Sequence, residues 1–339
     1  MGRSKIEYCD NTWNPITGCL YQGECKKCRG RTFAMTLCGD TRWNKNRTDL
    51  YRKEGDVYVL DNEFYRAEGK KVLMPFGYEP TIHRFRMDHI RYVTGCKLYV
   101  GSAAEMFGPW IEDKWLAQIF QTVASYPQHV YMFLTNYQER YTDLQQKGII
   151  DKAAKNIWYG AYSWGGNTAF PQNLPEGAHT YMYVHVNDLP VGYTNRKPEW
   201  IILDRHRFDK VLLPDVQTRI QHLVEACGKQ GIKLFMTKHI RSLAREEDIR
   251  MEFPSSMENY LWEHGMAGKN KERYCTRCNV CKKESRKKNM YPMNTIIGGV
   301  HKTIGYVCPD CAGALELKYG FNYSNGEDTE NEEAKLQKK

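Results

Sequence analysis

The 339-residue sequence lacks any long apolar run. No stretch approaches the roughly 18 consecutive apolar residues of a transmembrane helix, so no membrane span is expected. Residues 1–5 lead into polar and aromatic residues and not into the apolar segment of a secretory signal, which makes a cytoplasmic location the expectation. The sequence also has no internal repeat of fixed period, which argues against a repeat array.

Cysteine is the residue whose distribution is most informative. The chain has 12 cysteines, with three in a tight group near the N-terminus and five in another near the C-terminus. The rest of the composition, 41% hydrophobic and 26% charged, is that of a folded chain. Clustered cysteines in such a chain indicate metal or iron–sulfur binding in a reducing compartment and not a disulfide scaffold. The net charge of +9 permits a polyanionic partner without requiring one.

Short apolar strands alternate with amphipathic helices through the middle of the chain. This pattern predicts an α/β fold whose mainly parallel sheet is covered by helices, as a partial or full (β/α) barrel. An open doubly wound sheet is the alternative, but the G-x-G-x-x-G turn that would support it is absent. The expected strands are 97–101, 129–134, 156–162, 180–185, 199–203 and 232–236, and the expected helices are 112–125, 137–146 and 215–228.

Changes in composition divide the chain into four parts. Residues 1–245 are expected to form the barrel core, and residues 246–270, which are charged and poorly periodic, a linker. Residues 271–320 form a Cys-rich module, and residues 321–339, with almost no apolar content, a disordered tail.

The N-terminal cysteines Cys19, Cys25 and Cys28 follow a C-x5-C-x2-C spacing. Three thiolates on one loop can hold three irons of a [4Fe–4S] cluster and leave the fourth open to a small molecule such as S-adenosylmethionine (SAM). Cys9 or Cys38 could instead supply a fourth ligand, which would give a closed structural zinc or iron–sulfur site. The spacing does not decide between these two hypotheses.

Residues 5–19, which end in T-W-N-P-I-T-G-C, resemble the opening motif of a phage-associated radical-SAM-like family of uncharacterised function. The likeness implies a barrel of radical SAM type over about residues 5–240, with the three N-terminal cysteines as cluster ligands. This chain departs from the family at residues 204–208, where similar proteins have two glycines that allow backbone to approach a ligand. A departure there implies an altered SAM site or polar contacts from Asp204, Arg205 and His206 to a substrate. Shorter similar segments are 83–86, 100–107, 127–136, 157–160 and 231–238.

Polar residues follow several expected strands and are candidates for a pocket at the carboxyl ends of a barrel. From their positions, Glu105 and Asn136 are predicted to hydrogen-bond the amino or ribose groups of SAM. The basic stretch 83–91 is either a phosphate contact or a solvated face. The other candidates are Ser102, Thr135, Ser163, His185, Asp204, His206 and Lys238.

The C-terminal group contains two C-x2-C pairs typical of a structural zinc site. Of its five cysteines, the knuckle-like flanking residues favour four ligands, namely Cys278, Cys281, Cys308 and Cys311. Cys275 is then spare or replaces Cys278, and an auxiliary iron–sulfur cluster is the minority alternative. The basic run 282–288 is either a nucleic-acid phosphate contact or a solvated loop.

Together these features predict a radical SAM enzyme with a [4Fe–4S] cluster, SAM and zinc as its cofactors. It would need an electron donor to reduce the cluster, and its substrate would be a nucleic-acid base or modified nucleotide. The alternative is a non-catalytic zinc-binding protein that interacts with nucleic acid. An HNH-type nuclease is disfavoured because His301-Lys302 lacks the Asp-His pattern. The sequence leaves the oligomeric state open.

Overall fold

The computed structural model describes residues 4, 6–20, 29–163, 167–169, 174, 177–194, 196–205 and 214–265, and segments 275–277, 284–286, 291–297, 300–308 and 311 of the C-terminal part. The chain forms two compact units, residues 1–265 and residues 266–339, which are described separately. None of the described helices is long and apolar enough to cross a membrane.

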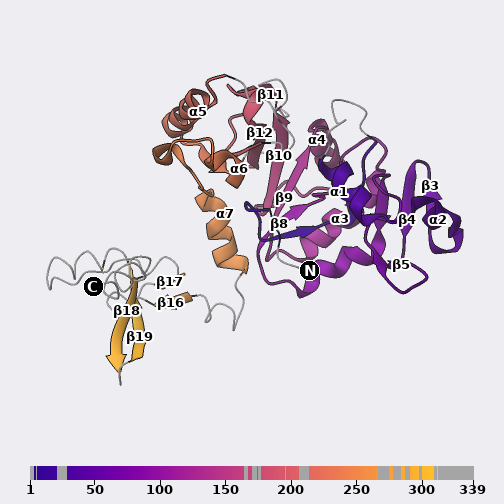
Figure 1. The fold of residues 1–339 in the computed structure, drawn as a ribbon, viewed down its shortest axis with the longest axis horizontal. Helices are drawn as coiled ribbons and strands as arrows, with labels where there is room; N and C mark the ends of the chain where they lie inside the picture. Colours follow the sequence, from indigo (N-terminus) through magenta and orange to yellow (C-terminus); the bar gives the residue numbers. More distant parts are fainter. Residues whose placement is uncertain are drawn as a thin grey trace, which may run out of the picture. The chain divides into compact units, whose positions relative to one another are not determined.

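One parallel sheet of seven strands organises the first unit (Figure 1). The strands lie side by side in the order in which they follow one another along the chain, without the reversal of a doubly wound sheet. The sheet curls into a half-barrel, which confirms the α/β fold and its barrel-like sheet. The strands are β1 (Asn11–Trp13), β8 (Lys97–Val100), β9 (Val130–Thr135), β10 (Ile157–Ser163), β12 (His179–His185), β14 (Trp200–Asp204) and β15 (Lys233–Met236).

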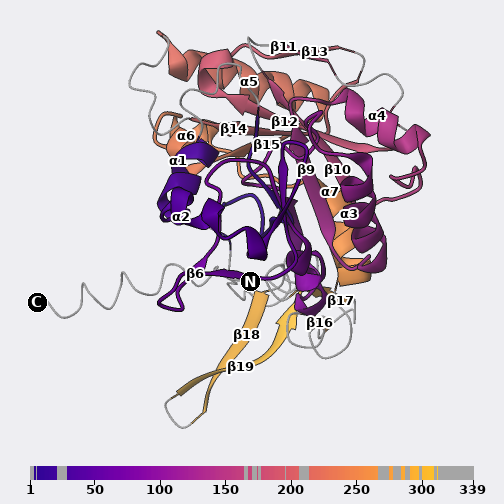
Figure 2. The ribbon, with the colours of Figure 1, turned by 90° about the vertical axis from the view of Figure 1, so that its right-hand side faces the viewer.

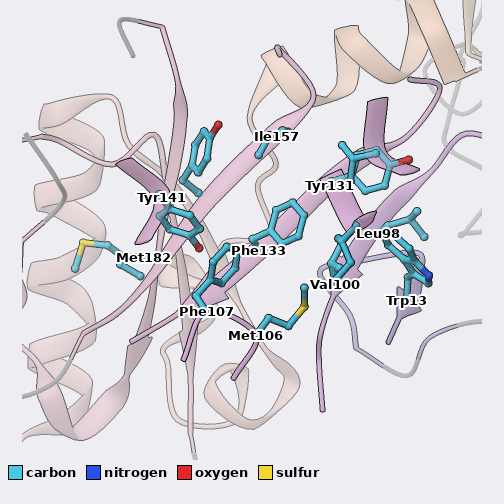
Figure 3. Close-up of a cluster of buried hydrophobic side chains, with 14 of the residues drawn as sticks. Trp13, Leu98, Val100, Met106, Phe107, Tyr131, Phe133, Tyr141, Ile157 and Met182 are labelled. Carbon is cyan, nitrogen blue, oxygen red and sulfur yellow. The ribbon is translucent and has the colours of Figure 1, made fainter. Parts of the chain in front are cut away.

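Helices α3 (Asp113–Ser125), α4 (Glu139–Gln146) and α5 (Val216–Gln230) follow one another around the outside of the sheet (Figure 2). A large apolar core fills the space between these helices and the strands. Aromatic rings at its centre point toward one another (Figure 3), and the ring centroids of Phe107 and Tyr141 are 4.8 Å apart. Burial of such rings provides much of the stabilisation of the outer layer.

The connection between β1 and β8 forms a separate lobe with its own antiparallel and parallel strand pairs. Its small core includes the stacked rings of Tyr58 and Phe76, with centroids 4.0 Å apart. The lobe contains β2 (Ile16–Thr17), α1 (Arg29–Leu37), α2 (Thr41–Asn46), η2 (Thr48–Leu50), β3 (Arg52–Glu54), β4 (Val57–Leu60), β5 (Phe64–Tyr65), β6 (Lys71–Val72), β7 (Thr81–His83) and η3 (Arg84–Tyr92).

The inner face of the half-barrel is covered by chain that the sequence predicts to be a linker. Residues 246–265 belong to the first compact unit, which ends at Gly265. Met257 on α7 (Ser255–Tyr260) is fully buried in the inner-face core, and Trp200 donates its indole N–H to the carbonyl of Glu252 over 3.0 Å. Burial of these apolar residues against the sheet explains why the segment folds despite its charge.

The remaining elements are short. In the first unit they are β11 (Asn167–Ala169), η4 (Val186–Asp188), β13 (Gly192–Thr194), α6 (Lys238–Arg241), η5 (Glu246–Asp248) and η6 (Leu261–Gly265). The second unit contains two antiparallel pairs, β16 (Cys275–Arg277) with β17 (Glu284–Arg286) and β18 (Tyr291–Ile297) with β19 (Val300–Val307). The tail predicted for residues 321–339 lies outside the described residues.

Substitution of Met257 by Ala tests whether the segment 246–265 stabilises the half-barrel. Met257 is 0% exposed, so we expect Met257→Ala to lower the free energy of unfolding by about 2–5 kcal/mol in urea denaturation. The matched control is Met251→Ala, because Met251 is 53% exposed and its loss should change the free energy by about 0.5 kcal/mol or less. Equal effects of the two substitutions would contradict the packing described.

Candidate functional site

The loops that follow β1 and β8 run side by side at the carboxyl edge of the sheet. Gly101 donates its N–H to the carbonyl of Trp13 over 2.8 Å. Farther along, Gly18 donates to the carbonyl of Ala103 over 2.8 Å, and Glu105 donates to the carbonyl of Gly18 over 3.2 Å. These backbone hydrogen bonds fix the chain that enters the N-terminal cysteine group against the end of the second strand.

Gly18 makes this approach possible. Its φ is +87°, a conformation that favours glycine, and a Cβ placed on it would lie 2.3 Å from the carbonyl oxygen of Glu79. The next residue, Cys19, is buried and donates its N–H to the carbonyl of Tyr78 over 2.9 Å. The position of Cys19 is therefore set by backbone contacts on both sides of the loop.

Cys25 and Cys28 lie outside the described residues, but the chain on either side of them is placed. Helix α1 begins at Arg29, directly after Cys28. Ala34 on α1 packs with Met74 and with Ala103, which also accepts the hydrogen bond of Gly18. Both ends of the segment that carries the two cysteines thus lie beside the loop after β8.

The two cysteines that could close the site have other partners. Cys9 lies before the amino end of β1, whereas Cys19 follows its carboxyl end, and the Cys9 thiol donates to Ser4 Oγ at 3.5 Å and to the Ile6 carbonyl at 3.7 Å. Burial raises the pKa of the Cys9 thiol to about 11. Cys38 donates to the carbonyls of neighbouring residues at 3.3 and 3.4 Å.

No group of three or more His, Cys, Asp or Glu side chains suited to a metal is found among the described residues, which include neither Cys25 nor Cys28. In the second unit, Cys308 is buried directly after β19 and Cys311 is half-buried. The other predicted zinc ligands, Cys278 and Cys281, lie outside the described residues. The predicted ligand sets therefore stay predictions.

Glu105 and Asn136 lie at the carboxyl ends of neighbouring strands and contact each other. The Glu105 carboxylate accepts hydrogen bonds from the backbone N–H and side-chain amide of Asn136 at 3.0 and 3.1 Å, and also from Thr135 and the N–H of Phe107. Burial raises the pKa of Glu105, although these donors oppose the shift. The carboxylate thus holds the two strand ends together, and the predicted contacts with SAM stay predictions.

Asp204 is the centre of a second polar group, at the ends of β12, β14 and β15. Its carboxylate accepts hydrogen bonds from the hydroxyl of Thr237 at 2.5 Å, the N–H of Arg205 at 2.8 Å and the hydroxyl of Tyr183. Asp204 is 5% exposed, so these donors replace the water that a carboxylate would otherwise bind. His206, predicted beside it, lies outside the described residues.

Three of the other strand-end candidates have structural partners, whereas the buried Oγ of Ser163 has no hydrogen-bond partner among the described groups. Ser102 donates its hydroxyl to Asn14 Oδ1 at 3.1 Å, and His185 Nδ1 accepts the N–H of Asn187 at 3.3 Å. The backbone N–H of Lys238 donates to the carboxylate of Glu7 at 2.7 Å. Ser163 is buried at the end of β10.

Four tyrosines on the inner face were not among the predicted site residues, namely Tyr8, Tyr99, Tyr162 and Tyr183. Tyr99, Tyr162 and Tyr183 belong to β8, β10 and β12, and Tyr8 comes from the N-terminal segment. The alternation of Tyr181 and Tyr183 on β12 was visible in the sequence, but aromatic residues in strands are typical of a core.

The basic stretch 83–91 contacts protein groups. Arg84 pairs with Asp61 at 2.6 Å, and Arg86 donates to the carbonyls of Asn14 and Leu73. His83 is fully buried, and its Nε2 lies 2.9 Å from the hydroxyl of Thr17. Burial holds the pKa of His83 well below its ordinary value of 6.5.

The burial of His83 makes the stability of the folded chain fall as the pH decreases. The unfolded chain takes up a proton on this residue below about pH 6.5, whereas the folded chain does not, so stability is present above that pH and falls as the pH decreases. We expect His83→Gln to reduce the slope of unfolding free energy against pH between about pH 6 and 5 by about 1.4 kcal/mol per pH unit. Identical slopes in urea titrations of the wild type and the variant would contradict this burial.

Residues 3–171 match a family model described as "Protein of unknown function (DUF5131)". The match extends from the N-terminal segment through β11 and includes the first cysteine group. No curated protein and no solved structure matches the chain. The N-terminal part of the chain is thus similar to a family of unknown function, and no activity comes with this similarity.

Proposed function

We propose that the protein is a radical SAM enzyme whose site lies at the carboxyl edge of the half-barrel. The position of Cys19 is the observation that carries this proposal. Cys19 follows the first strand of a parallel sheet whose strands lie in chain order, and its loop is bonded to the end of the second strand. Barrel enzymes place their reacting groups on such loops, at the carboxyl ends of the strands.

The cluster ligands in this proposal are Cys19, Cys25 and Cys28. Soft thiolates are the ligands that iron–sulfur clusters take, and three of them leave one iron for SAM. Cys9 and Cys19 lie at opposite ends of β1, and the Cys38 thiol contacts the carbonyls of Met35 and Gly39, which favours the open form over a closed site. When bound, the [4Fe–4S] cluster supplies the electron that cleaves SAM to a 5′-deoxyadenosyl radical, which then abstracts hydrogen from the substrate.

The chain's own residues position and shield this chemistry. Gly18 lets the backbone turn so that the Cys19 loop lies on the end of β8. Glu105 and Asn136 present polar atoms next to that loop, and we assign to them contacts with the amino or ribose groups of SAM. The apolar inner face excludes water from the interior of the half-barrel.

We further propose that the second unit binds a structural zinc ion through Cys278, Cys281, Cys308 and Cys311. Cys308 follows β19 and is buried, as a ligand in a closed site would be. The net charge of +9 and the basic run 282–288 support a nucleic-acid or nucleotide substrate. We also propose that the protein is located in the cytoplasm and that a one-electron donor reduces the cluster.

Iron content and SAM cleavage test the ligand assignment. After anaerobic purification and reconstitution, we expect about four irons per chain and 5′-deoxyadenosine on addition of SAM and a reductant. Cys25→Ser should lose the cluster and the product. The matched control is Cys38→Ser, which should keep both because that thiol contacts backbone carbonyls. Zinc in place of iron at the N-terminal site, or loss of iron in Cys38→Ser, would contradict the proposal.

Binding of nucleic acid at low salt tests the substrate class. We expect the full-length protein to bind single- or double-stranded oligonucleotides, with an affinity that falls as salt rises because phosphate contacts release counterions. Replacement of Lys282, Lys283, Lys287 and Lys288 by Ser should weaken this binding, whereas SAM cleavage should be unchanged. Absence of any affinity for DNA, RNA or nucleotides would contradict this substrate class.

A further inference from the structure

Four tyrosine rings form a continuous cluster on the inner face of the half-barrel. The centroid of Tyr8 lies 5.8 Å from that of Tyr99 and 6.2 Å from that of Tyr183. The centroids of Tyr162 and Tyr183 are 5.6 Å apart. The N-terminal segment and strands β8, β10 and β12 therefore bring four oxidisable side chains into contact on one face of the sheet.

The hydroxyl groups of this cluster lie in different surroundings. Burial raises the pKa of the phenols of Tyr8, Tyr99 and Tyr162. Tyr183 instead donates its hydroxyl proton to the Asp204 carboxylate. Tyr183 is half-buried, and Asp204 is 5% exposed.

Asp204 lies in direct contact with the hydroxyl proton of Tyr183. Thr237 and the N–H of Arg205 donate to one carboxylate oxygen, and Tyr183 donates to the other. The contacts of Thr237 and Arg205 fix the orientation of the carboxylate, so that its other oxygen meets the hydroxyl of Tyr183. A phenol that loses an electron becomes strongly acidic, so a base in contact with the hydroxyl makes oxidation of the tyrosine easier.

We propose that Tyr183 and Asp204 form a proton-coupled one-electron relay. Tyr183 is the residue of the tyrosine cluster that is oxidised, and Asp204 is its proton acceptor. Tyr183 gives up one electron, its O–H bond breaks, and the proton moves to Asp204, which leaves a neutral phenoxyl radical beside a neutral carboxylic acid. The ring of Tyr8 connects this pair to Tyr99 on β8. The cluster thus extends from the strand next to the Cys19 loop to the polar group on β14.

The role of this relay in turnover rests on the proposed function. A carbon-centred organic radical formed at the carboxyl edge accepts the electron of Tyr183 and a proton from solvent, and becomes a closed-shell C–H product. Tyr183 is then the phenoxyl radical and Asp204 the acid. A one-electron reductant of the class that the candidate cluster requires returns the electron, and Asp204 returns the proton to Tyr183.

The experiment uses the purified full-length protein and a photogenerated ruthenium(III) complex as the one-electron oxidant, without SAM. We expect a phenoxyl radical, detected by its optical absorption and its electron paramagnetic resonance (EPR) signal, whose formation rate is independent of pH between about pH 6 and 9 because Asp204 takes the proton. Tyr183→Phe should remove this signal. Asp204→Asn should slow its formation by about tenfold.

The matched control is Tyr65→Phe. Tyr65 also donates its hydroxyl to a carboxylate, that of Glu63, but it is 44% exposed and lies on β5, in the lobe between β1 and β8. Its loss should leave the signal unchanged. Circular dichroism and thermal melts of each variant establish that it is folded.

A signal of equal size and rate in Tyr183→Phe would overturn the proposal, as would a signal lost in Tyr65→Phe. A rate that rises with pH as in free tyrosine would also overturn it. Because no SAM is present, failure of this test is distinct from failure of SAM cleavage in the wild type, which would contradict the proposed function.

Discussion

The pairing of β1 with β8 is the constraint on which the rest of the site depends. Three residue pairs join the strands in parallel, from Asn11 with Leu98 to Trp13 with Val100. This ladder places the carboxyl ends of β1 and β8 side by side, although residues 14–96 separate the two strands in the sequence. Without it, the backbone bonds from Gly18 to the loop after β8 could not form, and Cys19 would have no fixed place at the edge of the sheet.

Elements with a strong local pattern could be predicted from the sequence. The expected strand 129–134 corresponds to β9 (Val130–Thr135), and the expected helix 215–228 to α5 (Val216–Gln230). Every residue of β9 is buried, and the buried residues of α5 recur with helical period, so each element can be predicted from residues that are close together in the sequence. β1 has no such signal, because Trp13 is its only large apolar residue and its partner is far along the chain. The sequence predicted that Glu105 and Asn136 follow two strands and therefore lie near each other, but it did not predict the hydrogen bonds between them.

The cover of the inner face could not be predicted for a related reason. It is assembled from separate segments, in which Tyr8, Met257 and Leu261 are buried among polar and charged neighbours. Each contributes apolar area that becomes visible only when the sheet is formed. The same assembly places Tyr183 against Asp204, a contact between two strands that neither strand's sequence indicates. The inner face therefore combines a packed apolar core with oxidisable side chains.

The central claim is that three thiolates bind a cluster and leave one iron open to SAM. The most direct measurement is the EPR spectrum of the reduced protein before and after addition of SAM. An open iron binds the amino and carboxylate groups of SAM, so the account predicts a [4Fe–4S] signal whose shape changes when SAM is added. A cluster signal that SAM leaves unaltered would show a closed site with four protein ligands and would contradict the account.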